Sequence, residues 1–309
     1  MKSRKVDPAH AAEEAPTGLP EYLTAVVRPG DRVLQIGPGT AAVELAARTR
    51  RPVVSVHSSL AHVEDVRAAL GPRGRSTGVV DAQVGDLFEG RPDASPFDLV
   101  VVTAGVRGLS PGWLDQLAPG GVVVAPVALG GLHPWVLVGP HARDGLLYGR
   151  VLAVDPPADA PPAAAGRLYE PRSTPEWEPP AQDAEPVWLG PLSPRPRPVR
   201  FLDLWLWLAG ADDRITAAET GVTGWGPGCA VAAGPHAVYV RPNGIWATDV
   251  EPVTMTLHQV LAEHVRRWLI QRQPQANEMT CHINRPPTGT DRLLTAAGWT
   301  VGRPVTLPR

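Results

Sequence analysis

The chain has 309 residues and a formal net charge of -2, with 43% hydrophobic and 19% charged residues. This length is enough for two domains, and the composition is typical of a globular protein. A nearly balanced charge gives no reason to expect a nucleic-acid partner. Cys229 and Cys281 are the two cysteines, too few for a disulfide framework or a four-cysteine zinc site, and we expect both to be small buried residues.

The chain contains no run of 18 apolar residues, and its first residues lack the apolar segment of a signal peptide. We therefore expect a cytoplasmic protein with no membrane partner. Residues 1–20 are polar and rich in alanine, which predicts a flexible N-terminal tail.

Residues 21–154 alternate short Val-rich runs with helix-like segments, the pattern of parallel strands that are buried on both faces. The runs lie at residues 32–36, 52–56, 79–84, 98–102 and 122–127. Residues 40–49 and 59–70 predict helices, and residues 135–138 and 146–154 predict an antiparallel pair at the sheet edge. The expected fold class is α/β, with a Rossmann-like, mostly parallel sheet and an antiparallel edge.

The composition changes at residues 155–198, where 13 prolines exclude a regular helix or a central strand. We expect a Pro-rich linker or a strap on the surface, which Trp177 and Trp188 could hold in place. Residues 199–309 predict a smaller C-terminal α+β domain. Its expected elements are a helix or strand at 201–209, a meander over 230–249, a helix at 256–272, a strand at 279–283, a short helix at 291–297 and a final strand.

A glycine turn, Gly37-Pro38-Gly39-Thr40, joins the first predicted strand to the first predicted helix. Glycines let the backbone approach a ligand closely, and the turn aims a helix N-terminus at that ligand. Its place is the carboxyl edge of the sheet, where open α/β sheets bind ligands. The spacing alone does not exclude a dinucleotide such as NAD, because the small residue Ala42 follows three positions after Gly39.

Four segments together resemble, in order and spacing, the motifs of the protein-L-isoaspartate O-methyltransferase family. They are VLQIGPGTAAVELAAR at 33–48, VGDLFEG at 84–90, PFDLVVVTAGV at 96–106 and LDQLAPGGVVVAPV at 114–127. The resemblance covers about residues 23–152. It implies a class I methyltransferase with S-adenosylmethionine as cofactor and a carboxylate of a peptide or protein as methyl acceptor.

The same resemblance implies roles for individual residues. Gly37 and Gly39 would line the methionine end of the cofactor, and Asp86 would accept a hydrogen bond from the adenine amino group. The implied cofactor-binding residues are Gly37, Pro38, Gly39, Thr40, His57, Ser58, Asp86, Leu87 and Thr103. Asp86 could equally be a turn-forming residue after its strand. No catalytic residue and no metal ligand is assigned.

The chain departs from the family at the end of the second strand, where an acidic residue would take both ribose hydroxyls and His57 stands instead. A carboxylate accepts two hydrogen bonds at once, whereas a neutral imidazole offers one donor and one acceptor. Ser58 and Ser59 could compensate in part. His57 could equally be a plain polar residue at a strand end.

Two further departures concern the acceptor site and the glycine turn. The family's Ser-x-Pro segment, which helps to form the isoaspartyl site, is replaced by Glu-Glu-Ala-Pro at residues 13–16. The third glycine of the turn is Ala41. Ordinary repair of isoaspartyl residues is therefore not expected.

The remaining candidate sites are weaker. His258 and His264 lie six residues apart and do not share a helix face, so they do not predict a metal pair, and we expect His264 at an internal interface. Tryptophans in the C-terminal region predict core packing, with a peptide-binding groove as the alternative. They are Trp205, Trp207, Trp225 and Trp246.

Three functional hypotheses follow. The first is an S-adenosylmethionine-dependent O-methyltransferase acting on a peptide or protein carboxylate. The second is a non-catalytic scaffold or regulatory partner that keeps the fold and has lost cofactor contacts, as His57, Ala41 and the missing serine indicate. A third, an NAD-dependent enzyme, lacks a recognisable hydride-transfer partner. The oligomeric state is not predicted.

Overall fold

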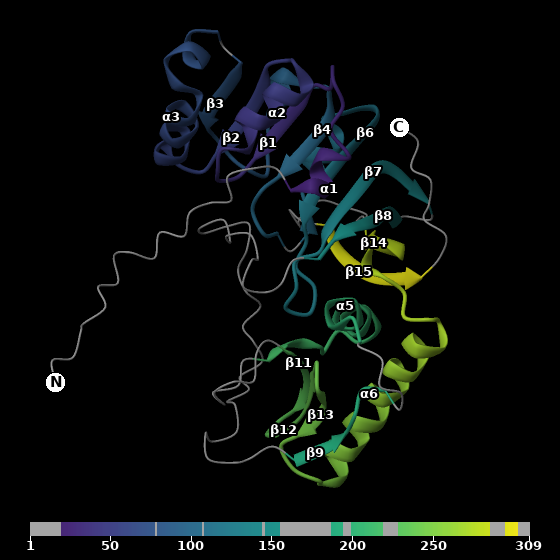
Figure 1. Cartoon of the computed structure of the whole chain (residues 1–309). Helices are drawn as coiled ribbons and strands as arrows, with labels where there is room; N and C mark the ends of the chain where they lie inside the picture. The colour runs from purple at the N-terminus through teal and green to yellow at the C-terminus, as the bar shows by residue number, and fades with distance from the viewer. Residues whose placement is uncertain are drawn as a thin grey trace, which may run out of the picture.

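The computed structural model describes residues 20–77, 79–106, 108–143, 146–154, 187–193, 199–218, 228–284 and 294–301. It contains two sheets, the larger formed mainly by the N-terminal half of the chain and the smaller by later segments, with α5 between them (Figure 1). Several predicted features lie outside the described residues: most of the N-terminal tail and of the linker, the residue 13–16 segment, Trp177 and Trp225.

The larger sheet has ten strands in the order β3-β2-β1-β4-β6-β7-β8-β14-β15-β5. Their bounds are β1 Val33–Ile36, β2 Val53–His57, β3 Val80–Val84, β4 Phe97–Val102, β5 Gly108–Leu109, β6 Leu117–Pro126, β7 Trp135–Arg143, β8 Leu146–Ala153, β14 Met279–Asn284 and β15 Leu294–Val301. The pairs from β3 to β6 are parallel, and those from β6 onward are antiparallel. The predicted fold class is confirmed, including the antiparallel pair at the edge.

Alternating residues of the central strands enter two different cores, which explains why these strands are mostly apolar. Val33 and Leu99 pack on the face that carries α1 Glu21–Thr24 and α2 Ala41–Thr49. Leu34 and Val100 pack on the opposite face. A strand that is covered on both sides buries both of its alternating sets of side chains, so most of its positions are apolar.

The remaining helices of this half are α3 Leu60–Thr77 and α4 Pro111–Asp115, with a 3-10 turn at Pro92–Ala94. α3 has a break at Gly71, where φ is +65°. Along this helix Val63 and Val66 are buried, whereas Leu60 is 62% exposed.

The smaller sheet has the order β10-β11-β12-β13-β9 and is antiparallel throughout. Its strands are β9 Val187–Gly190, β10 Thr216–Ala218, β11 Gly228–Ala233, β12 His236–Arg241 and β13 Gly244–Ala247. The helices beside it are α5 Phe201–Ala211 and α6 Pro252–Ile270, and a 3-10 turn covers Ala276–Glu278. The predicted meander and the predicted long helix are confirmed. β9 lies at the sheet edge, which is the place that its Pro-rich surroundings permit.

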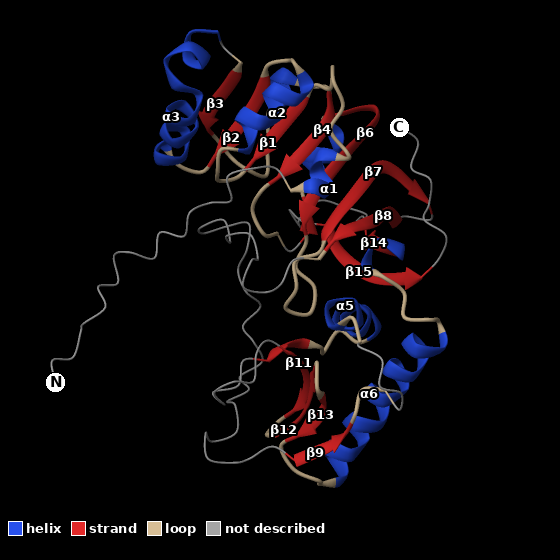
Figure 2. Ribbon diagram, in the orientation of Figure 1, coloured by secondary structure: helices blue, strands red, loops and turns tan. Residues whose placement is uncertain are grey.

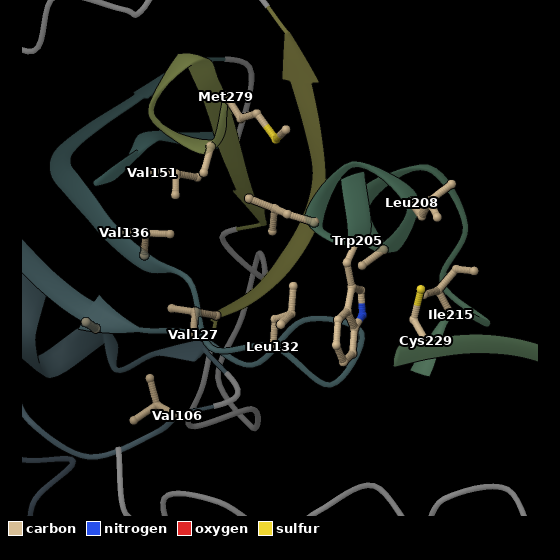
Figure 3. Packing of buried hydrophobic residues seen from close by; sticks show 14 of the residues in the cluster. Val106, Val127, Leu132, Val136, Val151, Trp205, Leu208, Ile215, Cys229 and Met279 are labelled. Atoms are coloured by element: carbon tan, nitrogen blue, oxygen red, sulfur yellow. The ribbon is translucent and has the colours of Figure 1, made fainter. Parts of the chain in front are cut away.

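One hydrophobic core continues from the larger sheet into the smaller one. Trp205 of α5 is 1% exposed and packs in the same cluster as Leu132, from the loop after β6, and Cys229 of β11 (Figure 3). Trp205 Nε1 also donates a hydrogen bond to the Gly130 carbonyl at 2.8 Å. Trp205 therefore serves the core, as predicted.

The end of the chain differs from the prediction in two ways. The short helix expected at residues 291–297 is wrong, because Leu294–Val301 forms β15 (Figure 2). β14 pairs with β8, and β15 pairs with β14 and β5, so both strands extend the N-terminal sheet. The ten-stranded sheet therefore includes strands from both sides of the domain boundary expected at residue 198. The physical reason is that β8 would otherwise leave an unpaired edge, which the C-terminal strand closes.

Candidate functional site

The candidate site lies at the carboxyl edge of β1 to β4, where the sheet order brings distant segments together. Gly37 follows β1, His57 ends β2, Gly85 follows β3 and Thr103 follows β4. Backbone bonds join these ends: Gly37 N donates to the Val56 carbonyl, and Gly85 N donates to the His57 carbonyl, both at 3.0 Å. The sequence predicted this gathering because parallel strands end at the same edge.

The glycine turn depends on its two glycines for different reasons. Gly37 has a φ of +108°, and a Cβ there would lie 3.1 Å from Thr103 Oγ1 and 3.2 Å from the Ala104 nitrogen. Gly39 has a φ of +91°, and a Cβ there would meet nothing within 4 Å. Gly37 therefore permits close packing of β1 on β4, whereas Gly39 leaves open space over the turn that leads into α2.

Gln35, a fully buried residue of β1, holds this turn in place. Its Nε2 donates to the Gly37 carbonyl at 3.0 Å and to Thr103 Oγ1 at 2.8 Å. Thr103 Oγ1 lies 2.7 Å from the Pro38 carbonyl, to which it donates. The turn is thus fixed from β1 and from β4 by hydrogen bonds that a flexible loop would lack.

His57 is fully buried, and its Nε2 lies 2.6 Å from Ser55 Oγ. Burial, and after it the neighbouring His62, lower the pKa of His57 to about 4, whereas the Gly37 carbonyl and Asp65 oppose the shift. His57 is therefore a neutral imidazole near pH 7. Its Nδ1 is buried and makes no hydrogen bond within the described part of the chain.

His62, in the first turn of α3, lies beside His57, with their ring centroids 6.3 Å apart. The Nδ1 of His62 is also buried and has no hydrogen-bond partner among the described residues. Such orphaned polar atoms are uncommon in proteins, and each calls for an explanation. Sequence reasoning missed His62, because nothing in its spacing indicates that α3 folds back over the end of β2.

Asp86 begins a turn after β3, and its side chain is exposed. Its Oδ1 accepts a hydrogen bond from the Phe88 nitrogen at 2.8 Å, and its carbonyl accepts one from Gly90 at 3.1 Å. The turn-forming role considered from the sequence is present. A role toward a cofactor stays a prediction.

Side chains from the region of α4 anchor the same turn. Trp113 Nε1 donates to the Leu87 carbonyl at 2.7 Å, and Ser110 Oγ donates to the Phe88 carbonyl at 2.6 Å. Gln116 Nε2 donates to the Glu89 carbonyl at 2.6 Å. Three consecutive carbonyls are thus held by side chains, which fixes the position of Asp86 at the edge of the site.

The other predicted site residues line the same edge. Pro38 is half-buried, and Thr40, which precedes α2 without a side-chain cap, is exposed. Ser58 is exposed, and Leu87 is buried. No carboxylate from the described residues faces His57 closely enough to form a hydrogen bond with it. In the part of the chain that the structure describes, no group of three metal-binding side chains gathers.

A model of the family "Protein-L-isoaspartate(D-aspartate) O-methyltransferase (PCMT)" matches residues 13–143. The N-terminal part of the chain is related to that family. Several proteins named protein-L-isoaspartate O-methyltransferase are similar to it. Those from Methylorubrum populi and Methanoculleus marisnigri are 38% identical over 104 residues and 37% identical over 113 residues. A third, from Cupriavidus necator, is 32% identical over 129 residues.

These matches cover only parts of both partners. They span 33%, 34% and 40% of this chain and 47%, 50% and 48% of the three relatives, in the order given for Methylorubrum, Methanoculleus and Cupriavidus. The chain thus spans about half the length of the curated relatives that it matches. The predicted resemblance is confirmed for this segment.

Solved structures give weaker likenesses. One protein-L-isoaspartate O-methyltransferase covers 89% of this chain and 80% of its own, with 20% identity and a TM-score of 0.43. A methyltransferase from Thiobacillus denitrificans in complex with S-adenosyl-L-homocysteine covers 33% and 44%, with 19% identity and a TM-score of 0.25. Likenesses of this strength carry no argument about function.

Proposed function

We propose that the chain is an S-adenosylmethionine-dependent O-methyltransferase that methylates a carboxylate of a peptide or protein. The observation that carries this proposal is the open space over Gly39, beside a buried His57 whose Nδ1 has no hydrogen-bond partner in the described residues. An open cradle and an unsatisfied acceptor at the carboxyl edge fit a nucleoside ligand. The relationship of residues 13–143 to the methyltransferase family supports the same ligand.

The residues proposed to hold the cofactor divide by the part of it that they would meet. Gly37 to Thr40 would lie against its methionine end, His57 and Ser58 near the ribose, and Asp86 and Leu87 near the adenine. Thr103 would lie beneath it. These residues fit the group because the backbone of the turn is fixed by Gln35 and Thr103 while the space over Gly39 stays open.

The chemistry asks little of acid or base residues. The bound cofactor would supply an electrophilic methyl group, and a carboxylate acceptor is already an anion at neutral pH. The protein then contributes orientation and removal of water from the acceptor oxygen. This explains why no catalytic residue is assigned to the chain.

The wider context of the site is also proposed. We place the protein in the cytoplasm; no helix among the described residues is long and apolar enough to cross a membrane. We propose that residues 21–154 and 199–309 form two domains, and the separate five-stranded sheet supports this division. β14 and β15 then belong by pairing to the first sheet, although they lie in the second segment of sequence.

Methyl transfer tests the proposal directly. The full chain is incubated with methyl-labelled S-adenosylmethionine and with peptides that carry isoaspartyl, aspartyl or C-terminal carboxylates. We expect label in at least one peptide, released as methanol at alkaline pH, as a methyl ester requires. Cofactor binding without any base-labile label would contradict the proposed activity.

A folded chain that neither binds the cofactor nor transfers label would favour the second candidate, a non-catalytic scaffold. The neutral, buried state of His57 is the observation behind it, because the imidazole cannot accept two hydroxyls at once as a carboxylate does. A scaffold predicts that the chain keeps its fold but has no measurable affinity for the cofactor.

A further inference from the structure

The hydrogen bonds around Gln35 determine where the protons lie. Gln35 Nε2 uses its two hydrogens on the Gly37 carbonyl and on Thr103 Oγ1. Gln35 Oε1 is then free to accept, and Ser55 Oγ donates its single proton to it. Gln35 and Ser55 are direct neighbours across β1 and β2, so the sheet register sets this contact.

Ser55 Oγ has no proton left for His57 Nε2, which lies 2.6 Å away. This contact is a hydrogen bond only if His57 Nε2 carries the proton and Ser55 Oγ accepts it. His57 is therefore the tautomer protonated on Nε2. Its Nδ1 presents a lone pair, and this is the atom that has no partner in the described chain.

His62 supplies a second buried ring nitrogen. Its Nδ1 has no partner among the described residues, and its ring lies 6.3 Å from that of His57, measured between centroids. Two neighbouring imidazoles that both present a lone pair can accept hydrogen bonds from two adjacent hydroxyls of one ligand. A single imidazole could satisfy only one of them.

We propose that His57 Nδ1 and His62 Nδ1 together accept the two hydroxyls of a ribose cis-diol, doing with two ring nitrogens what a single carboxylate would do. This inference rests on the proposed function, since it names the ribose-binding group of that cofactor site. It assigns a binding role to His62, and it makes Gln35 and Ser55 positioning residues that fix the tautomer of His57.

The surroundings of the pair are suited to a nucleoside. The connection between the two histidines, Ser58 to Ala61, is mostly exposed. Two large apolar side chains are exposed beside the pair: Leu60, at 62%, and Val84, at 50%, which is opposite His57 in the strand register. Exposed apolar groups next to a polar pair can contact the faces of a base.

The test is calorimetric titration of the full chain with S-adenosylhomocysteine and with its 2′-deoxy and 3′-deoxy analogues. We expect each missing hydroxyl to weaken binding of the wild type by about 10-fold, the worth of one hydrogen bond. His57→Phe and His62→Phe should each weaken the parent ligand by a similar factor. Each variant should then bind one of the two deoxy analogues as tightly as it binds the parent ligand, and should bind the other analogue more weakly.

Thr49→Val is the matched control, because Thr49 is a fully buried hydroxyl of α2 that bonds within its own helix. It should change the affinity by less than twofold. Nitrogen-15 NMR of the unliganded wild type provides a readout that does not depend on any variant. We expect the resonance pattern of the Nε2–H tautomer for His57, and a shift of its Nδ1 signal when the ligand binds.

Two results would overturn the inference alone: equal affinity for the parent ligand and both deoxy analogues, or an Nδ1–H tautomer in the free protein. No binding of S-adenosylhomocysteine by the wild type would overturn the proposed function and this inference with it. The two failures are thus distinguishable.

Discussion

Gly37 and Gly39 have separable roles, although both have positive φ. Gly37→Ala places its methyl group against Thr103 Oγ1 and the Ala104 backbone, whereas Gly39→Ala extends into open space. We expect Gly39→Ala to lose about 1–3 kcal/mol of unfolding free energy from backbone strain, and Gly37→Ala to lose more. Urea unfolding measures this order.

The affinities of the same two variants for S-adenosylhomocysteine should not follow the order of their stabilities. The methyl group of Gly39→Ala would occupy the space proposed for the cofactor, so its affinity for S-adenosylhomocysteine should fall further than its stability loss explains. A Gly39→Ala protein with wild-type affinity would remove the turn from the proposed site.

The neutral state of His57 makes stability depend on pH. Its pKa is about 4 in the folded chain, against an ordinary value of 6.5, so the unfolded chain binds the proton first as the pH falls. Stability is therefore lost between pH 6.5 and pH 4, by up to roughly 3 kcal/mol. His57→Gln should remove this part of the slope, which urea unfolding at several pH values would show.

The other histidines with lowered pKa values do not affect the comparison of the wild type with His57→Gln. Burial also lowers the pKa values of His133, His258 and His264, and these contribute equally to the slope of the wild type and of the variant. Parallel slopes for the two proteins would mean that His57 is not held neutral by the fold.

For individual residues, the sequence predicted where they lie in the fold but not which side chains they contact. Gly37, His57 and Thr103 could be placed at one edge because strand ends are visible in Val-rich runs. The Gln35–Ser55–His57 chain could not, because it depends on the pairing of Gln35 with Ser55 across two strands. Register between parallel strands is set by tertiary packing and leaves no local signal in either strand.

At the scale of elements, the turn that carries Asp86 depends on a residue outside it. Trp113 is fully buried, and its Nε1 is the donor to the Leu87 carbonyl. Trp113→Phe keeps most of the apolar contact and leaves that carbonyl unsatisfied, so we expect a loss of about 1–3 kcal/mol in unfolding free energy. Chemical denaturation followed by circular dichroism measures it.

Trp188→Phe is the control for that variant, since Trp188 is 56% exposed in β9. Its unfolding free energy should change by less than about 0.5 kcal/mol. Equal effects of the two substitutions would show that the bond to Leu87 contributes nothing to stability.

The strand β15 shows where element prediction failed. Residues 291–297 include leucine and alanine, which favour a helix, but Leu294–Val301 pairs with β14 and with the short β5. Pairing with an edge strand that is distant in sequence outweighs a local preference of a few tenths of a kcal/mol per residue. The long elements α6 and β11 to β13 were predictable because their periodicity is strong.

At the scale of the whole molecule, the two sheets share one core around α5. Trp205→Phe removes the bond to the Gly130 carbonyl from the centre of that core. We expect a loss of about 1–3 kcal/mol and a single unfolding transition, because the segments on both sides unfold together. Calorimetry and tryptophan fluorescence should give the same midpoint, and two separated transitions would contradict a shared core.

The central claim is that the carboxyl edge of β1 to β4 binds a nucleoside cofactor. Calorimetric titration of the full chain with S-adenosylhomocysteine, beside an Asp86→Ala variant, tests it most directly. The account predicts micromolar binding by the wild type and at least a 10-fold loss in the variant, since Asp86 is proposed to meet the adenine. Absence of binding by a folded wild-type chain would contradict the claim and leave the scaffold as the better reading.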